Sequence, residues 1–407
     1  MSERLDVARV RAEFPQLRES IRGKSLVYLD NAASTLKPVA VIERLDAYYR
    51  REASNVHRGA HWLSSQGTAA YEGARETVRE FLGAALASEI VFTRGTTESI
   101  NLVAQSWGRA NLMAGDEILL SELEHHSNIV PWQVIAQERG ARIRVIPITD
   151  AGEIDFAAFE RLLSAKTKMV SISWCSNALG SIAPVEKFVA AAHAAGSLIL
   201  IDAAQSVSSI PADVAALGCD FLTFSGHKLF GPYGIGVLYG KADLLEAMPP
   251  YQTGGSMIAD VTFEKTTWAA VPQKFEAGTP SIADALGLAA AIRFVEGLGL
   301  EAIARHEHEL MKVALARLGE IPGVRLIGRP ERRAAIVSFL VDGAHPSDIG
   351  SLVDNEGVAI RAGHHCCQPL MKRLGVPGTC RASFSIYNTD DDVERLVRSV
   401  IKAKEFF

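Results

Sequence analysis

The chain has 407 residues, of which 48% are hydrophobic and 22% are charged, and its formal net charge is −5 at pH 7. A chain of this length exceeds what one small core can organise, so we expect two domains. The acidic balance disfavours nucleic acid as the main partner, because phosphate neutralisation needs a basic surface. The richest apolar stretch, residues 188–201, is too short and too interrupted to span a bilayer.

The N-terminus and the cysteines favour a cytoplasmic protein. Residues 1–6 are charged and lack the apolar segment of a secretory signal. Five cysteines occur at irregular spacing, which is not a disulfide framework in a chain this long. We therefore expect a reducing compartment and no membrane partner.

Short β-rich runs alternate with helical patterns in the first part of the chain. Strands are predicted at 25–29, 89–93, 117–121, 142–146, 168–174, 198–201, 221–224 and 235–239. Helices are predicted at 98–112, 127–139, 154–163 and 185–195. This alternation predicts an α/β fold with a mostly parallel sheet covered by helices on both faces. Ligands of such sheets bind at the carboxyl ends of the strands.

The pattern changes after residue 280. Helices are predicted at 281–295, 300–318 and 390–405, and strands at 334–341 and 382–387. We interpret residues 23–296 as a large domain and residues 297–407 as a smaller α+β domain, joined by an N-terminal arm, residues 1–22. Residues 254–275 lack periodicity and are expected to form a long irregular loop.

Two charged residues each follow a buried strand closely. Asp202 ends an uncharged apolar run, and Lys228 follows Ser225-Gly226-His227. Taken singly, they read as a buried ion pair and a solvated loop lysine. Together they match what pyridoxal phosphate (PLP) needs: an amine that holds it as a Schiff base and a carboxylate that keeps its ring nitrogen protonated. Gln205 lies three residues after Asp202 and is placed to donate to a ring oxygen.

A candidate phosphate site begins the predicted helix after residue 93. Thr96 and Thr97 precede Glu98, which is ordinary helix-capping chemistry. The same backbone N–H groups suit a phosphate. Ser225 and His227 would add side-chain donors to it. No Walker-type lysine motif and no G-x-G-x-x-G is present, so a nucleotide is a poor alternative.

His125 and His126 follow the strand predicted at 117–121. Neighbours on an extended segment point to opposite sides, and no further ligand lies at metal spacing, so we expect no metal site. An aromatic face for a planar cofactor is the better functional interpretation of His125. A solvent-exposed loop histidine is the alternative.

Residues 361–367, Arg-Ala-Gly-His-His-Cys-Cys, form a second chemical centre. A free cysteine is more often a small buried hydrophobe than a nucleophile. A glycine-containing loop with two histidines and an arginine is electropositive, however, and such a setting favours a thiolate. Arg381 could pair bidentately with a substrate carboxylate, unless it is a surface arginine.

These motifs, together with residues 28–33, 55–59, 176–177 and 275–280, resemble the Suf-type (group II) cysteine desulfurases among the class V aminotransferase-like PLP enzymes. The matching segments run nearly from end to end. The resemblance implies the aspartate aminotransferase-like fold of PLP-dependent transferases (fold type I). It also implies conversion of L-cysteine to L-alanine with a persulfide on Cys366, supplying sulfur for iron–sulfur cluster assembly. Selenocysteine lyase, cysteine sulfinate desulfinase, a class V transaminase and an inactive scaffold are the alternatives.

The resemblance also implies a role for each matching residue. Lys228 holds PLP and moves protons, and Asp202 pairs with the ring nitrogen. His125 stacks on the ring and is expected to be catalytic as an acid or base. The ring oxygen or substrate is contacted by Asn177 and Gln205. The phosphate is held by Thr96, Thr97, Ser225, His227 and, from the other subunit of a homodimer, Thr279. The substrate carboxylate is held by Arg381, Arg361 and His57. L-selenocysteine is an alternative substrate, and an acceptor of the SufE or SufU kind is the expected protein partner.

The chain departs from the common pattern of this family at three places. Trp174-Cys175 stands where a His-Val pair is expected, and Ala203 follows Asp202 where glycine is usual. Cys367 stands beside the nucleophile, where alanine is common. Cys367 could be inert, could accept sulfur, or could form a vicinal disulfide with Cys366. We prefer the inert interpretation.

Overall fold

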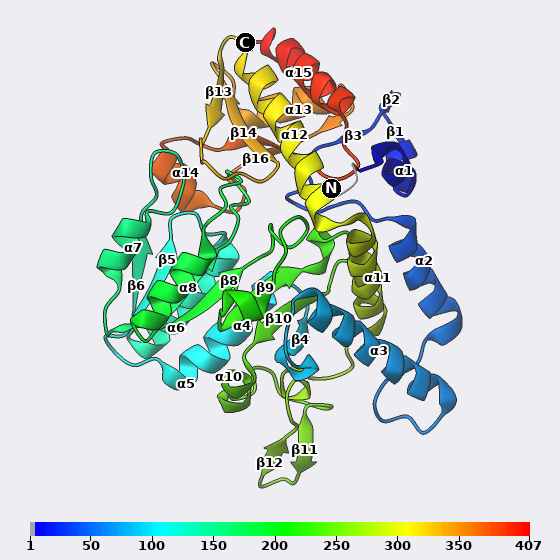
Figure 1. Cartoon of the computed structure of the whole chain (residues 1–407), viewed down its shortest axis with the longest axis vertical. Helices are drawn as coiled ribbons and strands as arrows, with labels where there is room; N and C mark the ends of the chain where they lie inside the picture. The colour runs from blue at the N-terminus through cyan, green and yellow to red at the C-terminus, as the bar shows by residue number, and fades with distance from the viewer. Residues whose placement is uncertain (1–4) are drawn as a thin grey trace.

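The computed structural model describes residues 5–407, and a seven-stranded sheet forms its centre (Figure 1). The strand order is β4-β10-β9-β8-β7-β5-β6. The strands are β4 (Ile90–Thr93), β5 (Glu117–Ser121), β6 (Arg142–Ile146), β7 (Thr167–Ser173), β8 (Leu198–Asp202), β9 (Phe221–Ser225) and β10 (Gly236–Gly240). β10 is antiparallel to both of its neighbours, and the other strand pairs are parallel. The predicted α/β class with a mostly parallel sheet is confirmed.

Helices cover both faces of this sheet, and the strand sequences show why. In β8, Ile199 and Ile201 belong to one hydrophobic cluster and Leu200 to another, so consecutive apolar residues serve opposite faces. The first cluster includes residues of α3 (Trp62–Phe81), α8 (Val185–Ala194) and α11 (Ile282–Leu298). The second includes residues of α4 (Thr96–Val103) and α6 (Val130–Arg139).

A second, four-stranded antiparallel sheet lies in the C-terminal part of the chain. Its order is β13 (Val324–Ile327), β14 (Ile336–Val341), β17 (Thr379–Ser383) and β16 (Arg361–Gly363). It shares a hydrophobic cluster with α12 (Leu300–Gly319), α13 (Pro346–Asp354) and α15 (Asp390–Lys404). β3 (Val27–Tyr28) pairs in parallel with β15 (Val358–Ala359), and Val27 joins the same cluster. We infer from this separate core that residues 297–407 form most of the smaller domain. Val27 and Leu29, from the range expected in the large domain, pack with it, whereas Val10, Phe14 and Leu17 of the N-terminal arm belong to the first cluster.

Three local expectations differ from the structure. The strand expected at 382–387 is wrong: β17 ends at Ser383, and the Asn388 N–H closes a turn onto the Ser385 carbonyl. The loop 254–275 contains a hairpin of β11 (Ile258–Val261) and β12 (Thr266–Trp268), which projects from the body of the molecule in Figure 1. Because most of its residues are exposed, the hairpin has no hydrophobic periodicity that sequence could reveal. The helix predicted at 98–112 begins at Thr96 and is π-helical over Ala104–Gly108.

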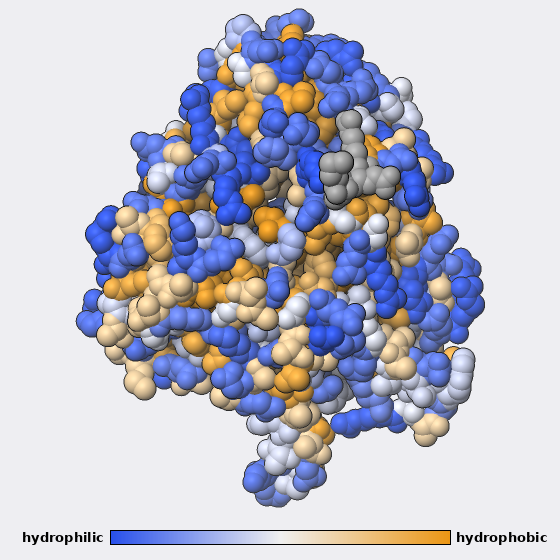
Figure 2. All heavy atoms as spheres, in the orientation of Figure 1, coloured by the Kyte–Doolittle hydropathy of each residue, from blue (hydrophilic) through white to orange (hydrophobic). Residues whose placement is uncertain are grey.

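Three further observations concern the N-terminal segment, membrane-spanning helices and the surface. Residues 1–4, which carry most of the charged N-terminal segment, lie outside the described residues. Within residues 5–407, no helix has the length and apolar character needed to cross a membrane. Figure 2 shows hydrophilic and hydrophobic side chains interspersed over one face of the molecule.

Glu307 on α12 is a buried carboxyl group whose charge costs stability. Ser385 Oγ donates to it at 3.4 Å, and burial raises its pKa to about 8 from an ordinary 4.5. Between pH 4.5 and 8, the folded protein therefore keeps the proton on Glu307, whereas the unfolded chain has lost it. This contribution to stability is complete below pH 4.5 and is lost as the pH rises toward 8.

We expect Glu307→Gln to flatten the decline in unfolding free energy between pH 4.5 and 8. One such group accounts for at most about 1.4 kcal/mol per pH unit. Urea unfolding at several pH values measures the slope. Glu309→Gln, on the exposed side of the same helix, is the matched control and should leave the slope unchanged. An equal slope in wild type and Glu307→Gln would show that Glu307 titrates normally.

Candidate active site

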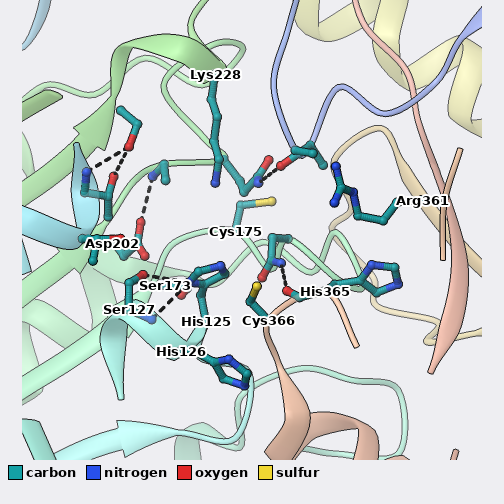
Figure 3. Close-up of a pocket in the computed structure, with 18 of the residues that line it drawn as sticks. His125, His126, Ser127, Ser173, Cys175, Asp202, Lys228, Arg361, His365 and Cys366 are labelled. Carbon is teal, nitrogen blue, oxygen red and sulfur yellow. Dashed lines mark hydrogen bonds between the residues drawn. The ribbon is translucent and has the colours of Figure 1, made fainter. Parts of the chain in front are cut away.

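A pocket of about 590 Å³ opens where β7, β8 and β9 end (Figure 3). Their last residues, Ser173, Asp202 and Ser225, all line it. Of the predicted site residues, it is lined by Thr96, Thr97, His125, Asn177, Asp202, Gln205, Ser225, His227, Lys228, Arg361, Cys366 and Arg381. The structure therefore gathers residues from both sheets around one cavity.

Asp202 and Lys228 are an acid and a base that line this pocket, the first buried and the second half-buried. Asp202 is 5% exposed, and its Oδ1 accepts the Ala204 N–H at 2.9 Å. Burial raises the pKa of Asp202 and lowers that of Lys228, and the attraction between the two partly opposes both shifts. The turn before Lys228 needs Gly226, because a Cβ there would lie 2.8 Å from Ile235 Cγ2. A buried carboxylate with so few protein donors fits a cationic ring nitrogen.

The end of the pocket near α4 fits a phosphate. Thr96 N–H donates to Ser225 Oγ at 2.9 Å, and that hydroxyl donates to Thr96 Oγ1 at 2.9 Å. β10 lies against the start of α4 so closely that a Cβ on Gly236 would be 2.4 Å from Gly95 Cα. His227 Nδ1 is buried and has no hydrogen-bond partner among residues 5–407. A helix N-terminus with an unused ring nitrogen beside it suits an anion.

His125 is held in a neutral form. Its Nδ1 lies 2.7 Å from Ser127 Oγ and accepts the Ser127 N–H at 3.1 Å. Burial, followed by the charge of Lys228, lowers the pKa of His125 to about 4. The neutral ring therefore carries its proton on Nε2. Such a ring can lie against a planar cofactor without adding charge to the pocket.

Cys366 is the exposed cysteine at the rim of this pocket, whereas Cys175, Cys219, Cys367 and Cys380 are buried. All five thiols are free, so the vicinal disulfide considered for Cys366 is not formed. Cys367 Sγ donates to Asn177 Oδ1 at 3.1 Å, and burial raises its pKa to about 12. These contacts agree with an inert, protonated Cys367.

The two candidate carboxylate-binding arginines share a partner that the sequence did not suggest. Arg381 is 1% exposed; it donates to the Asn177 carbonyl at 2.8 Å and to Asp30 Oδ1 at 3.1 Å. Arg361 donates to both oxygens of Asp30. Arg381 Nε is buried without a partner in the described part of the chain. Because Asp30 follows a strand of only two residues, the sequence pointed to it as a site residue only through its place in the motif at residues 28–33.

Two predicted site residues do not line this pocket. His57 Nε2 lies 2.9 Å from Glu72 Oε1, which directs the ring to α3. Thr279 lines a separate cavity of about 300 Å³ together with Tyr71 and Glu276. One chain therefore does not bring either residue to Lys228. Conversely, Ser173 and Cys175 line the pocket but were not predicted as site residues. Only the strand register shows which residues at the end of β7 and just after it reach the pocket.

Comparisons with known proteins agree with this arrangement. The model of the family "Aminotransferase class-V" matches residues 27–396. A cysteine desulfurase of Synechococcus elongatus is 53% identical over 97% of this chain, but the chain spans only 63% of that protein's length. A probable cysteine desulfurase of Halalkalibacterium halodurans is 52% identical, with 97% of each chain covered. The structure of the cysteine desulfurase CsdA from Escherichia coli, in an S-sulfonic acid form, superposes with a TM-score of 0.93 at 41% identity over 100% of both chains. The chain therefore belongs to the class V aminotransferase family, among its cysteine desulfurase relatives.

Proposed function

We propose that this protein is a PLP-dependent cysteine desulfurase that converts L-cysteine to L-alanine and keeps the sulfur on Cys366. The observation that carries this proposal is the exposed Cys366 thiol on the rim of the pocket that contains Lys228 and Asp202. Relatives named cysteine desulfurases, with almost full coverage of both chains, support it. A transaminase has no use for a thiol at this place.

The residues present fit PLP. The unused His227 Nδ1 and the N-terminus of α4 suit its phosphate, and the buried Asp202 suits its ring nitrogen. When bound, PLP supplies an electron sink for the substrate carbon atoms. Burial lowers the pKa of Lys228, so its amine is more readily neutral and able to bind an aldehyde or move a proton. Arg381, with its unpartnered Nε, is suited to a substrate carboxylate.

The net reaction balances without an added oxidant. The Cys366 thiolate attacks the substrate sulfur, and the bond from that sulfur to the substrate β-carbon breaks. The electron pair stays with the carbon, which takes up a proton to become the methyl group of alanine. Cys366 is left as a persulfide.

We place the homodimer and the acceptor within the same proposal. Thr279 lies outside the pocket of one chain, so its expected phosphate contact needs a second copy. Cys366 is exposed, as transfer to a SufE- or SufU-type acceptor for iron–sulfur cluster assembly requires. A reducing cytoplasm suits the five free cysteines.

The test is the mass of the PLP-loaded protein after incubation with L-cysteine, without acceptor or reductant. We expect one added sulfur atom, located by peptide mapping on Cys366 and not on Cys367, together with released alanine. Alanine without sulfur on Cys366 would mean that another route removes the sulfur. Conversion of PLP to its amine form would instead indicate a transaminase.

A further inference from the structure

The loop that carries Cys366 has a costly backbone conformation. His365 and Cys366 have φ values of +54° and +55°, although neither is glycine. Consecutive residues with side chains rarely adopt this left-handed conformation, and it persists only where the surroundings fix it. Contacts from outside the loop must therefore hold Cys366 in place.

Two residues, Asn177 and His126, supply these contacts alternately along the loop. Asn177 Nδ2 donates to the His365 carbonyl at 2.7 Å, and its Oδ1 accepts from Cys367 Sγ. His126 binds the other two positions: its backbone N–H donates to the Cys366 carbonyl at 2.8 Å, and its Nε2 accepts the Gln368 N–H at 3.1 Å. Four successive residues are thus held from two sides.

The His126 imidazole also caps a helix that begins two residues after the nucleophile. Gln368 is the first residue of α14 (Gln368–Leu374), and the first N–H groups of a helix have no partner within it. Nε2 accepts one of them, which requires the neutral ring with its proton on Nδ1. The backbone hydrogen bond to the Cys366 carbonyl places His126 on the Cys366 side of the pocket, and both residues are labelled in Figure 3.

We propose that His126 is a positioning residue, whose imidazole fixes the backbone on the C-terminal side of Cys366 and so aims its thiol into the pocket. This inference rests on the proposed function only in taking Cys366 as the nucleophile. Mutation of the side chain leaves the backbone N–H of residue 126 in place. The effect of the imidazole can therefore be separated from that of the main chain.

The experiment compares His126→Ala, His126→Gln and wild type as PLP-loaded protein. A glutamine amide oxygen can take the place of Nε2 as acceptor, whereas alanine cannot. His308→Ala, on an exposed position of α12, is the matched control. The two readouts are amide hydrogen exchange of the peptide containing Gln368, without substrate, and kcat and KM for alanine formation from L-cysteine.

We expect the Gln368 amide to exchange faster in His126→Ala and kcat to fall roughly tenfold, because a displaced nucleophile reacts more slowly. KM should stay near the wild-type value, since the candidate carboxylate-binding arginines are untouched. His126→Gln should restore both protection and kcat. Wild-type values in His126→Ala, or no rescue by glutamine, would overturn the inference, and so would loss of PLP absorbance in His126→Ala.

The inference and the proposed function fail in different ways. If wild-type protein gains no sulfur on Cys366, the proposed function is wrong, while the exchange data still report whether His126 holds the loop. If wild type gains the sulfur and His126→Ala matches it in kcat and protection, only the positioning role is wrong.

Discussion

Cys366→Ser should abolish desulfuration while leaving the visible absorbance of bound PLP unchanged. We expect alanine formation from L-cysteine to fall by at least about 10³-fold, because removing a nucleophile eliminates its route rather than weakening it. A hydroxyl is a poor acceptor of the substrate sulfur. PLP should remain bound, because Lys228, Asp202 and the phosphate end of the pocket are not altered.

The neighbouring cysteine provides the matched control for this prediction. Cys367→Ser removes a thiol next to the nucleophile but keeps a donor toward Asn177. Because the serine hydroxyl is smaller than the thiol but can still donate this hydrogen bond, we expect at most about a threefold change in kcat. If Cys367→Ser were as inactive as Cys366→Ser, Cys367 would have to accept sulfur or hold the site together, and its inert interpretation would be wrong.

The Cys366→Ser variant also separates the alternative substrates. Sulfinate and selenium can leave a substrate without a protein thiol. If Cys366→Ser retains wild-type rates on cysteine sulfinate or selenocysteine but not on cysteine, the Cys366 thiol is needed only for the reaction with cysteine. Full retention on L-cysteine would contradict the nucleophile assignment.

Residues that end buried strands were predictable from sequence, and the physical reason is topological. Asp202 and Ser225 end β8 and β9, which are parallel neighbours in the sheet. The carboxyl ends of parallel neighbours meet at one edge, so apolar runs followed by polar residues locate the pocket. The candidate phosphate site could be predicted for a similar reason. α4 starts after β4, and β4 lies two strands away from β9 in the same sheet.

Contacts between distant segments could not be predicted in this way. The hydrogen bond from Gln368 to His126 spans 242 positions, and the one from Asn177 to His365 spans 188. No local periodicity encodes such a pairing, so the residues that hold Cys366 became visible only in three dimensions. The role of Asp30 between two arginines was hidden for the same reason. The positions of His57 and Thr279, outside the pocket of one chain, could not be predicted either, because a motif does not give the place of its residues in three dimensions.

Asp202→Asn should retain PLP but lose most of the activity. Asparagine has nearly the shape of aspartate but no negative charge to keep the ring nitrogen protonated, so the electron sink weakens. We expect kcat to fall by about 10²–10³-fold, the range seen when one preorganised electrostatic partner is removed. Alanine formation by the PLP-loaded variant measures the loss, and Asp391→Asn, on the exposed side of α15, is the control.

The charge of Asp202 should also be visible before any substrate is added. Burial lowers the pKa of Lys228, and the negative charge of Asp202 opposes that shift. Asp202→Asn removes the opposition, so the Lys228 pKa falls further and more of the amine is neutral at a given pH. The rate at which cofactor-free protein binds PLP can be measured as a function of pH. The acid limb of this pH–rate profile should therefore move to lower pH. An acid limb that stays at the same pH, together with wild-type kcat, would show that Asp202 and Lys228 do not act as a pair.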